Sequence, residues 1–202
     1  MPSIITHAAV PLALWCAADR GRIPPRLLAA GVIAAMLPDA DVLAFALHIP
    51  YADAFGHRGA SHSLLFAFVL AAVAAVLAFF GSGRPWSAVS CQPRLAPAKA
   101  GPTAASTVQA AVFVFICAAS HPLLDAMTSG GLGVALAWPW SEQRFFAPWR
   151  PIRVSPFAPQ FFSARGLATL LSELRWVWLP LAGAVVAWKL IQPAPAAQRD
   201  PS

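Results

Sequence analysis

The stretch LLFAFVLAAVAAVLAFF, residues 64–80, contains no polar side chain. A helix of this length extends about 25 Å, at about 1.5 Å per residue, and nearly crosses the roughly 30 Å hydrocarbon core of a bilayer. We therefore predict a transmembrane helix from Leu64 to Phe80, and this helix decides the class of fold.

Four further apolar stretches lie on either side of this helix. They are Ile4 to Ala18, Leu27 to Leu47, Val108 to Met127 and Trp176 to Ile191. The chain as a whole is 58% hydrophobic and 11% charged, whereas a soluble domain has about 45–50% apolar and about 25% charged residues. We predict an all-α, polytopic membrane helix bundle of about five spans. Residues 1–192 would form one membrane-embedded domain and residues 193–202 a polar tail.

The connections between the spans differ in their basic residues, and this difference predicts an orientation. Short loops that are rich in Lys and Arg usually stay in the cytoplasm. The connections at residues 19–26 and 81–106 each carry three basic residues, whereas the connection at 48–61 carries only Arg58. We therefore predict that the amino terminus lies outside and the carboxyl tail inside.

The connection from Thr128 to Arg175 is too apolar for a plain linker. Its prolines alternate with Trp138, Trp140, Phe145, Phe146, Trp149, Phe157, Phe161 and Phe162. This composition is typical of a segment that lies on the bilayer interface or folds over the helix ends.

Composition also excludes two classes of function. The formal net charge is +6, but the basic residues are scattered and form no dense run, so we expect no nucleic-acid partner. Cys16, Cys91 and Cys117 are far apart in the sequence, whereas a thiolate zinc site or a redox motif needs closely spaced cysteines. We expect Cys16 and Cys117 to act as small apolar residues.

The informative residues are the ionisable ones at the ends of the predicted spans. Such groups are costly in hydrocarbon unless they are paired, solvated or bound to metal. They are His7, Asp39, Asp41, His57, Arg58, His62, His121 and Asp125. Because successive spans run antiparallel, the start of the first span, the end of the second, the start of the third and the end of the fourth share one membrane face. The sequence therefore predicts that these residues cluster there.

Their chemistry and spacing are those of metal ligands. Histidine with carboxylate suits zinc, manganese or iron at a hydrolytic site. His121 and Asp125 are four residues apart and would share one face of a helix. Asp39 and Asp41 cannot share a helical face, but Pro38 would disturb the backbone and could aim both carboxylates at one point.

A structural role for these residues is the alternative. Asp39 or Asp41 could pair with Arg58, and His121 with Asp125 could form a helix-packing hydrogen bond. Outside the cluster, we expect Asp53, Glu142 and Glu173 to be solvated or paired with arginines.

The motifs together resemble those of the YdjM-like membrane-bound metal-dependent hydrolases, a family of LexA-regulated inner-membrane proteins. The resemblance covers most of the chain and rests on His7, Leu37-Pro38-Asp39-Ala40-Asp41, His57-Arg58-Gly59-Ala60-Ser61-His62-Ser63, His121-Pro122-Leu123-Leu124-Asp125 with Thr128 and Gly130, Trp138-Pro139-Trp140-Ser141 and Arg144-Phe145-Phe146. It implies a multi-span inner-membrane protein with a His/Asp metal site and hydrolase activity, and it implies no particular substrate.

We therefore expect a metal-dependent hydrolase in which metal-activated water attacks an ester or phosphoester. The expected ligands of one or two divalent ions, zinc first and manganese next, are His7, Asp39, Asp41, His62, His121 and Asp125. His57 would be a further ligand or a general base, and Arg58 would steady the developing anion. With the amino terminus outside, the site lies on the outer face, where a small-molecule or lipid-derived substrate would reach it from the membrane lipid.

Three other functions remain open at this point. A metal-independent phosphatase with a histidine nucleophile is disfavoured, because its Lys-rich and Ser-Gly-His motifs are absent from the sequence. A metal-ion carrier would place its ligands near the bilayer midplane. A non-catalytic membrane scaffold would use the cluster for structure alone.

Overall fold

The computed structural model describes residues 1–18, 22–81, 104–156 and 160–192. Within these residues there is no β-strand, and two isolated bridges, Thr128 with Ile152 and Val134 with Phe145, are the only sheet-like pairs. The helices form five rods. They are η1–α1 (Ile4–Ala8, Ala9–Ala17), α2–η2–α3 (Pro25–Met36, Leu37–Val42, Leu43–Ala46), α4 (Leu64–Gly81), α5 (Ala104–Ala126) and α6–η5–α7 (Ala164–Glu173, Leu174–Trp178, Leu179–Ile191).

The predicted all-α membrane bundle is confirmed. Three helical segments are long and apolar enough to cross a membrane, namely Pro25–Ala46, Ser106–Ala126 and Ala164–Ile191. Ile4–Ala17 and Leu64–Phe80 are shorter apolar helices. The tail at 193–202, which we predicted to be polar, lies outside the described residues.

The last rod begins earlier than we predicted. The prediction placed its start at Trp176, but α6 begins at Ala164 and continues through the π-helical turn η5 into α7. The Ser163 side chain caps this start, because its Oγ accepts a hydrogen bond from the Arg165 N–H. The sequence pattern does not indicate this earlier start, because Arg165, Glu173 and Arg175 interrupt the apolar run.

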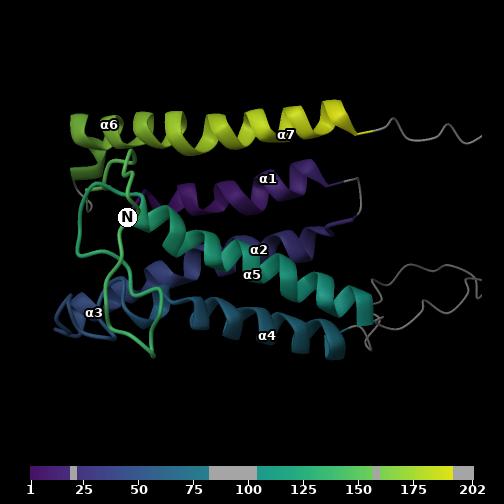
Figure 1. The fold of residues 1–202 in the computed structure, drawn as a ribbon, viewed down its shortest axis with the longest axis horizontal. Helices are drawn as coiled ribbons and strands as arrows, with labels where there is room; N and C mark the ends of the chain where they lie inside the picture. The colour runs from purple at the N-terminus through teal and green to yellow at the C-terminus, as the bar shows by residue number, and fades with distance from the viewer. Residues whose placement is uncertain (19–21, 82–103, 157–159, 193–202) are drawn as a thin grey trace, which may run out of the picture.

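The rods lie side by side, with α5 packed against both α2 and α4, while α7 packs against α1 (Figure 1). The core between α2, α4 and α5 is built from small residues with Phe113 and Val114. Small side chains let helix backbones approach closely, which is how helices associate in a membrane.

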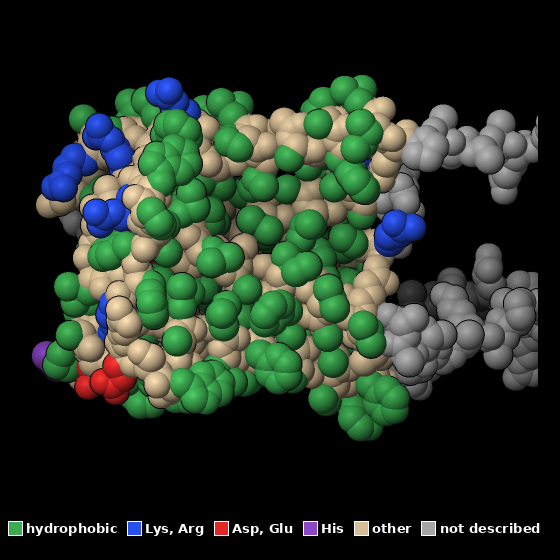
Figure 2. All heavy atoms as spheres, in the orientation of Figure 1, with side chains coloured by type: hydrophobic (Ala, Val, Ile, Leu, Met, Phe, Trp, Pro, Cys, Tyr) green, Lys and Arg blue, Asp and Glu red, His purple; other side chains and the backbone are tan. Residues whose placement is uncertain are grey.

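The sides of the bundle are apolar. Figure 2 shows hydrophobic side chains covering the middle of the visible face, with charged side chains towards its two ends. The exposed apolar residues of the helices include Leu77, Phe80, Leu190 and Ile191. A soluble monomer would bury such a continuous surface, so the fold presents it to lipid.

The connection between α5 and α6, described at residues 127–156 and 160–163, folds over one end of the bundle. The Ala135 N–H donates to the Arg58 carbonyl, and the Leu64 N–H donates to the Leu136 carbonyl. Arg144 donates to the carbonyls of Tyr51, Asp53 and His57 in the connection between α3 and α4. The amino terminus lies at the same end (Figure 1). This end holds the polar residues that the sequence singles out.

Candidate metal centre

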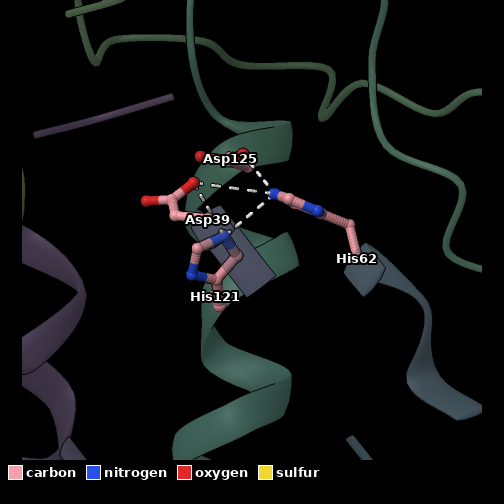
Figure 3. A group of neighbouring side chains, drawn as sticks. All are labelled: Asp39, His62, His121 and Asp125. Carbon is pink, nitrogen blue, oxygen red and sulfur yellow. Dashed lines mark hydrogen bonds and ion pairs between the residues drawn. The ribbon is translucent and has the colours of Figure 1, made fainter. Parts of the chain in front are cut away.

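Four side chains meet beneath this loop: Asp39, His62, His121 and Asp125 (Figure 3). One ligand atom from each lies within 4.8 Å of the others, and all four residues are buried. His121 and Asp125 come from one face of α5, as their spacing predicted, and Figure 3 shows both on that helix. Asp39 comes from η2 and His62 from η3 (Ala60–His62).

The backbone change at Pro38 separates the two aspartates. Helix α2 ends at Met36 and tightens into the 3-10 helix η2. Asp39 faces the group of four, whereas Asp41 accepts hydrogen bonds from the Arg58 N–H and Ser61 Oγ. The two carboxylates therefore do not meet at one point. They approach opposite nitrogens of the same imidazole, since Asp39 Oδ1 lies 3.9 Å from His62 Nε2 and Asp41 Oδ2 lies 3.1 Å from His62 Nδ1.

The missing N–H of Pro38 also affects the orientation of His121. In a 3-10 helix, the N–H of residue 38 would bond to the carbonyl of residue 35, but proline has no N–H. The Ala35 carbonyl instead accepts a hydrogen bond of 2.7 Å from His121 Nδ1. Metal-binding histidines typically use their second nitrogen in this way, with a carbonyl or a carboxylate as the partner.

With both Nδ1 atoms engaged, the Nε2 atoms of His62 and His121 face each other at 2.9 Å. Two neutral imidazoles would then point lone pairs at each other, which is repulsive unless a proton or a cation lies between them. In the connection before α4, burial lowers the pKa of His62, but hydrogen bonds to Asp125 and Asp41 outweigh it and raise that pKa to about 9. A metal ion bound at Nε2 would displace this proton.

Two further distances in the group also fit a cation. Asp39 Oδ1 lies 3.5 Å from His121 Nε2, and Asp125 Oδ2 lies 3.2 Å from His62 Nε2. Ligands about 2.0–2.2 Å from a tetrahedral zinc ion lie about 3.3–3.6 Å from one another. Within the described residues, neither carboxylate oxygen of Asp39 receives a hydrogen bond, although both are buried. Buried polar atoms without partners require an explanation, and a cation supplies one.

His7 lies beside this group without being one of the four. Its ring stacks on His121 with 3.7 Å between ring centroids. Its Nε2 lies 3.6 Å from Asp39 Oδ2 and 3.7 Å from Asp125 Oδ1, the carboxylate oxygens that point away from His62. The imidazole is fully buried, and neither of its nitrogens has a hydrogen-bond partner among the described residues.

Arg58 is fully buried against the group. Its Nε lies 3.1 Å from Asp125 Oδ2, Nη2 donates to Thr128 Oγ1, and Nη1 donates to the Gly130 carbonyl. Its backbone has a φ of 64°, a conformation that non-glycine residues adopt infrequently and that is enriched at functional sites. The side chain thereby joins the connection before α4 to the loop after α5.

His57 stands one step further from the group. Its Nδ1 donates a 2.5 Å hydrogen bond to Asp41 Oδ1. Asp41 therefore lies between two imidazoles, with His57 on one side and His62 on the other. Asp41, which the sequence analysis predicts to be a ligand, is not one of the four residues of the group. It contacts the group through His62.

Glu173 also belongs to this end of the bundle, and the sequence analysis does not predict its role. The expectation that Glu173 is solvated or paired with an arginine is wrong, because it is buried at 1% exposure. Its carboxylate accepts hydrogen bonds from the Ser3 N–H, Ser3 Oγ and Thr6 Oγ1. The last rod therefore holds η1, the segment that carries His7. Asp53 and Glu142 differ from it, since both are exposed.

Replacing Glu173 by alanine is expected to lower the free energy of unfolding by about 2–4 kcal/mol, because three buried donors lose their acceptor. Glu173→Gln retains an oxygen for the Ser3 N–H and should lose much less. Glu142→Ala, at an exposed position, is the matched control. Thermal unfolding in detergent measures the differences, and equal midpoints for Glu173→Ala and Glu142→Ala would contradict this role.

The fold and the site together define a helical membrane protein with a buried His/Asp cluster that could bind metal. A family model described as "YdjM inner membrane protein" matches residues 1–196, and the chain belongs to this family. The inner membrane protein YbcI of Escherichia coli (strain K12) is 45% identical over 181 residues, which are 89% of this chain and 92% of that protein. The comparison with solved structures gave no significant match.

Proposed function

We propose that the protein is a metal-dependent hydrolase of the inner membrane that cleaves an ester or phosphoester of a lipid-derived substrate. The observation that carries the proposal is the pair of opposed Nε2 atoms of His62 and His121, 2.9 Å apart and flanked by two buried carboxylates. The fewer basic residues in the connection that precedes His62 support a multi-pass topology with the site on the outer face.

The side chains divide into ligands and supporting groups. Asp39, His62, His121 and Asp125 would hold the cation, zinc first and manganese next, with His7 as a further ligand. Asp41 and the Ala35 carbonyl fix the ring orientations of the two histidines through their Nδ1 atoms. Ligands that are oriented by outer partners bind metal more tightly than free ones.

His57 and Arg58 are the two remaining candidate residues, and we assign them roles in proton transfer and charge stabilisation. When bound, the cation would lower the pKa of a water molecule towards about 7 and polarise the carbonyl or phosphoryl oxygen of the substrate. Asp41 accepts the hydrogen bond of His57 Nδ1, so Nε2 is the nitrogen of His57 that can take up a proton, and we assign His57 as the general base through this nitrogen. Arg58 balances the negative charge of Asp125 and steadies the anion that develops beside it.

Chelation and reconstitution test the activity. Purified protein in detergent would be screened against nitrophenyl esters, nitrophenyl phosphate and a long-chain lipid phosphate. We expect hydrolysis that EDTA abolishes and that zinc or manganese restores. His121→Ala should lower it at least 100-fold, whereas Glu142→Ala should leave it unchanged.

Three results would contradict the proposal. Hydrolysis that is insensitive to chelators would favour a histidine nucleophile. Metal uptake into proteoliposomes without hydrolysis would favour a carrier. Bound metal with neither activity would favour a structural role for the cluster.

A further inference from the structure

An apolar cavity of about 410 Å³ adjoins the candidate metal centre. Its lining includes Ile4, Ile5, Val42, Phe161 and Phe162, and it also includes Asp39. Its volume lies within the range of about 300–1,000 Å³ that is typical of small-molecule sites. The cavity therefore joins a hydrocarbon-like wall to a carboxylate of the metal group.

The apolar part of the cavity lining is exposed, whereas its carboxylate is buried. Ile4 is 46%, Ile5 59% and Phe162 92% exposed, whereas Asp39 is 2% exposed. The exposed residues belong to the start of the first apolar helix and to η4 (Gln160–Phe162), both at the site end of the bundle. The exposed apolar side chains and the buried carboxylate would together let a hydrocarbon chain lie against the wall while its polar head reaches Asp39.

A second, larger cavity shows that apolar lining alone does not mark the site. A groove of about 750 Å³ lies between α2, α4 and α5 and is lined by residues such as Ile33, Val73 and Leu77. Its lining includes none of the four residues of the metal group. The smaller cavity is therefore the one whose occupant would be in contact with the reacting groups.

We propose that the smaller cavity binds the hydrocarbon chain of the substrate, and that the substrate is a long-chain lipid ester or lipid phosphate that enters sideways from the bilayer. This inference rests on the proposed function. The chain would lie between Ile4, Ile5 and Phe162, and the polar head would lie at Asp39. A small polar substrate would leave the apolar wall without a partner.

The cavity would favour long-chain substrates because it positions the hydrocarbon chain, and not because it removes that chain from water. Lipid tails are as apolar as leucine side chains, so transfer from bilayer to cavity brings little free energy by itself. The cavity instead holds the bond to be cleaved at a fixed distance from the metal group, and this kind of positioning is what accelerates reactions between bound groups. Filling the cavity should therefore block long-chain substrates specifically.

Photocrosslinking tests the cavity without requiring turnover. The probe is a single-chain, sixteen-carbon lipid phosphate with a diazirine near the end of its chain, added to the full-length protein in detergent micelles. We expect crosslinks on the peptides that contain Ile4 and Ile5 or Phe161 and Phe162, and unlabelled probe should compete for them. Ile5→Trp fills the cavity at an exposed position, and it should lower this crosslinking at least fivefold.

Val73→Trp, which fills the groove between α2 and α4 at a similarly exposed position, is the matched control and should leave these crosslinks unchanged. Crosslinks that resist competition, or that Ile5→Trp and Val73→Trp lower equally, would overturn the proposal. Ile4→Trp provides a second filling variant should Ile5→Trp fail to fold.

Metal content separates this proposal from the proposed function. Ile5→Trp should keep the metal content of the wild type, because no metal ligand changes. His121→Ala should lose metal and still crosslink the probe within twofold of the wild type. Crosslinking confined to the groove, in protein that retains metal, would overturn the cavity and leave the metal site standing.

Discussion

Replacing Arg58 by methionine is expected to lower the free energy of unfolding by about 3–5 kcal/mol, the usual cost of leaving one partner of a buried ion pair uncompensated. Arg58 and Asp125 both have 0% exposed side chains, and the Arg58 Nε lies 3.1 Å from Asp125 Oδ2. The variant also leaves Thr128 Oγ1 and the Gly130 carbonyl without the donors of the guanidinium. Thermal or denaturant unfolding in detergent measures the loss.

Three further variants show whether the effect belongs to the site. Arg150→Met removes an exposed arginine and should change stability by less than about 0.5 kcal/mol. Gly131→Ala should mimic Arg58→Met in part, because Gly131 has a φ of 90° and a Cβ there would lie 2.7 Å from Arg58 Nη1. Gly183→Ala, inside α7, where a Cβ meets nothing within 4 Å, should not destabilise the protein. A fully stable Arg58→Met would contradict the assigned pairing.

Graded loss of metal affinity is the second large effect that we expect. His121→Ala removes a ligand and should abolish binding. Asp41→Asn changes none of the four residues of the group; it alters the carboxylate that contacts His62 Nδ1 and that also accepts hydrogen bonds from His57, the Arg58 N–H and Ser61. Outer partners of this kind contribute about 10–100-fold to metal affinity. Competition between the protein and a chromophoric zinc chelator measures both variants.

Asp53→Asn is the matched control, since Asp53 is exposed in the same connection and should not affect affinity. If Asp41→Asn abolished binding as fully as His121→Ala does, Asp41 would be a direct ligand and the assigned geometry would be wrong. If Asp41→Asn had no effect, the hydrogen bond to His62 would have no role in metal binding.

Much of the fold follows from local sequence. Runs such as Leu64 to Phe80 have only one stable arrangement in hydrocarbon, a helix, so their number and order can be predicted. The juxtaposition of His121 with Asp125 follows from helical periodicity. The ionisable residues of the first four spans are predicted to lie at one end because successive spans run antiparallel. The structure brings all eight predicted site residues together at that end.

The finer geometry depends on contacts that no local pattern contains. Asp39 lies against His121 of α5, whereas Asp41 takes its partners from the connection before α4. Arg58 turns towards Asp125 through a positive φ, which its sequence neighbours do not indicate. Glu173 is buried because Ser3 and Thr6, about 170 positions away, supply its donors. The charged residues Arg165, Glu173 and Arg175, which interrupt the apolar run, also concealed the start of α6.

Elemental analysis of the detergent-purified wild type, beside His121→Ala and Asp125→Ala, tests the central claim most directly. Size-exclusion profiles would first establish that all three proteins are folded. We expect about one equivalent or more of zinc or manganese in the wild type and none in either variant. Absence of metal from all three proteins, even after incubation with zinc and manganese, would show that the buried His/Asp cluster is a packing network, and would contradict the metal centre on which the proposed function rests.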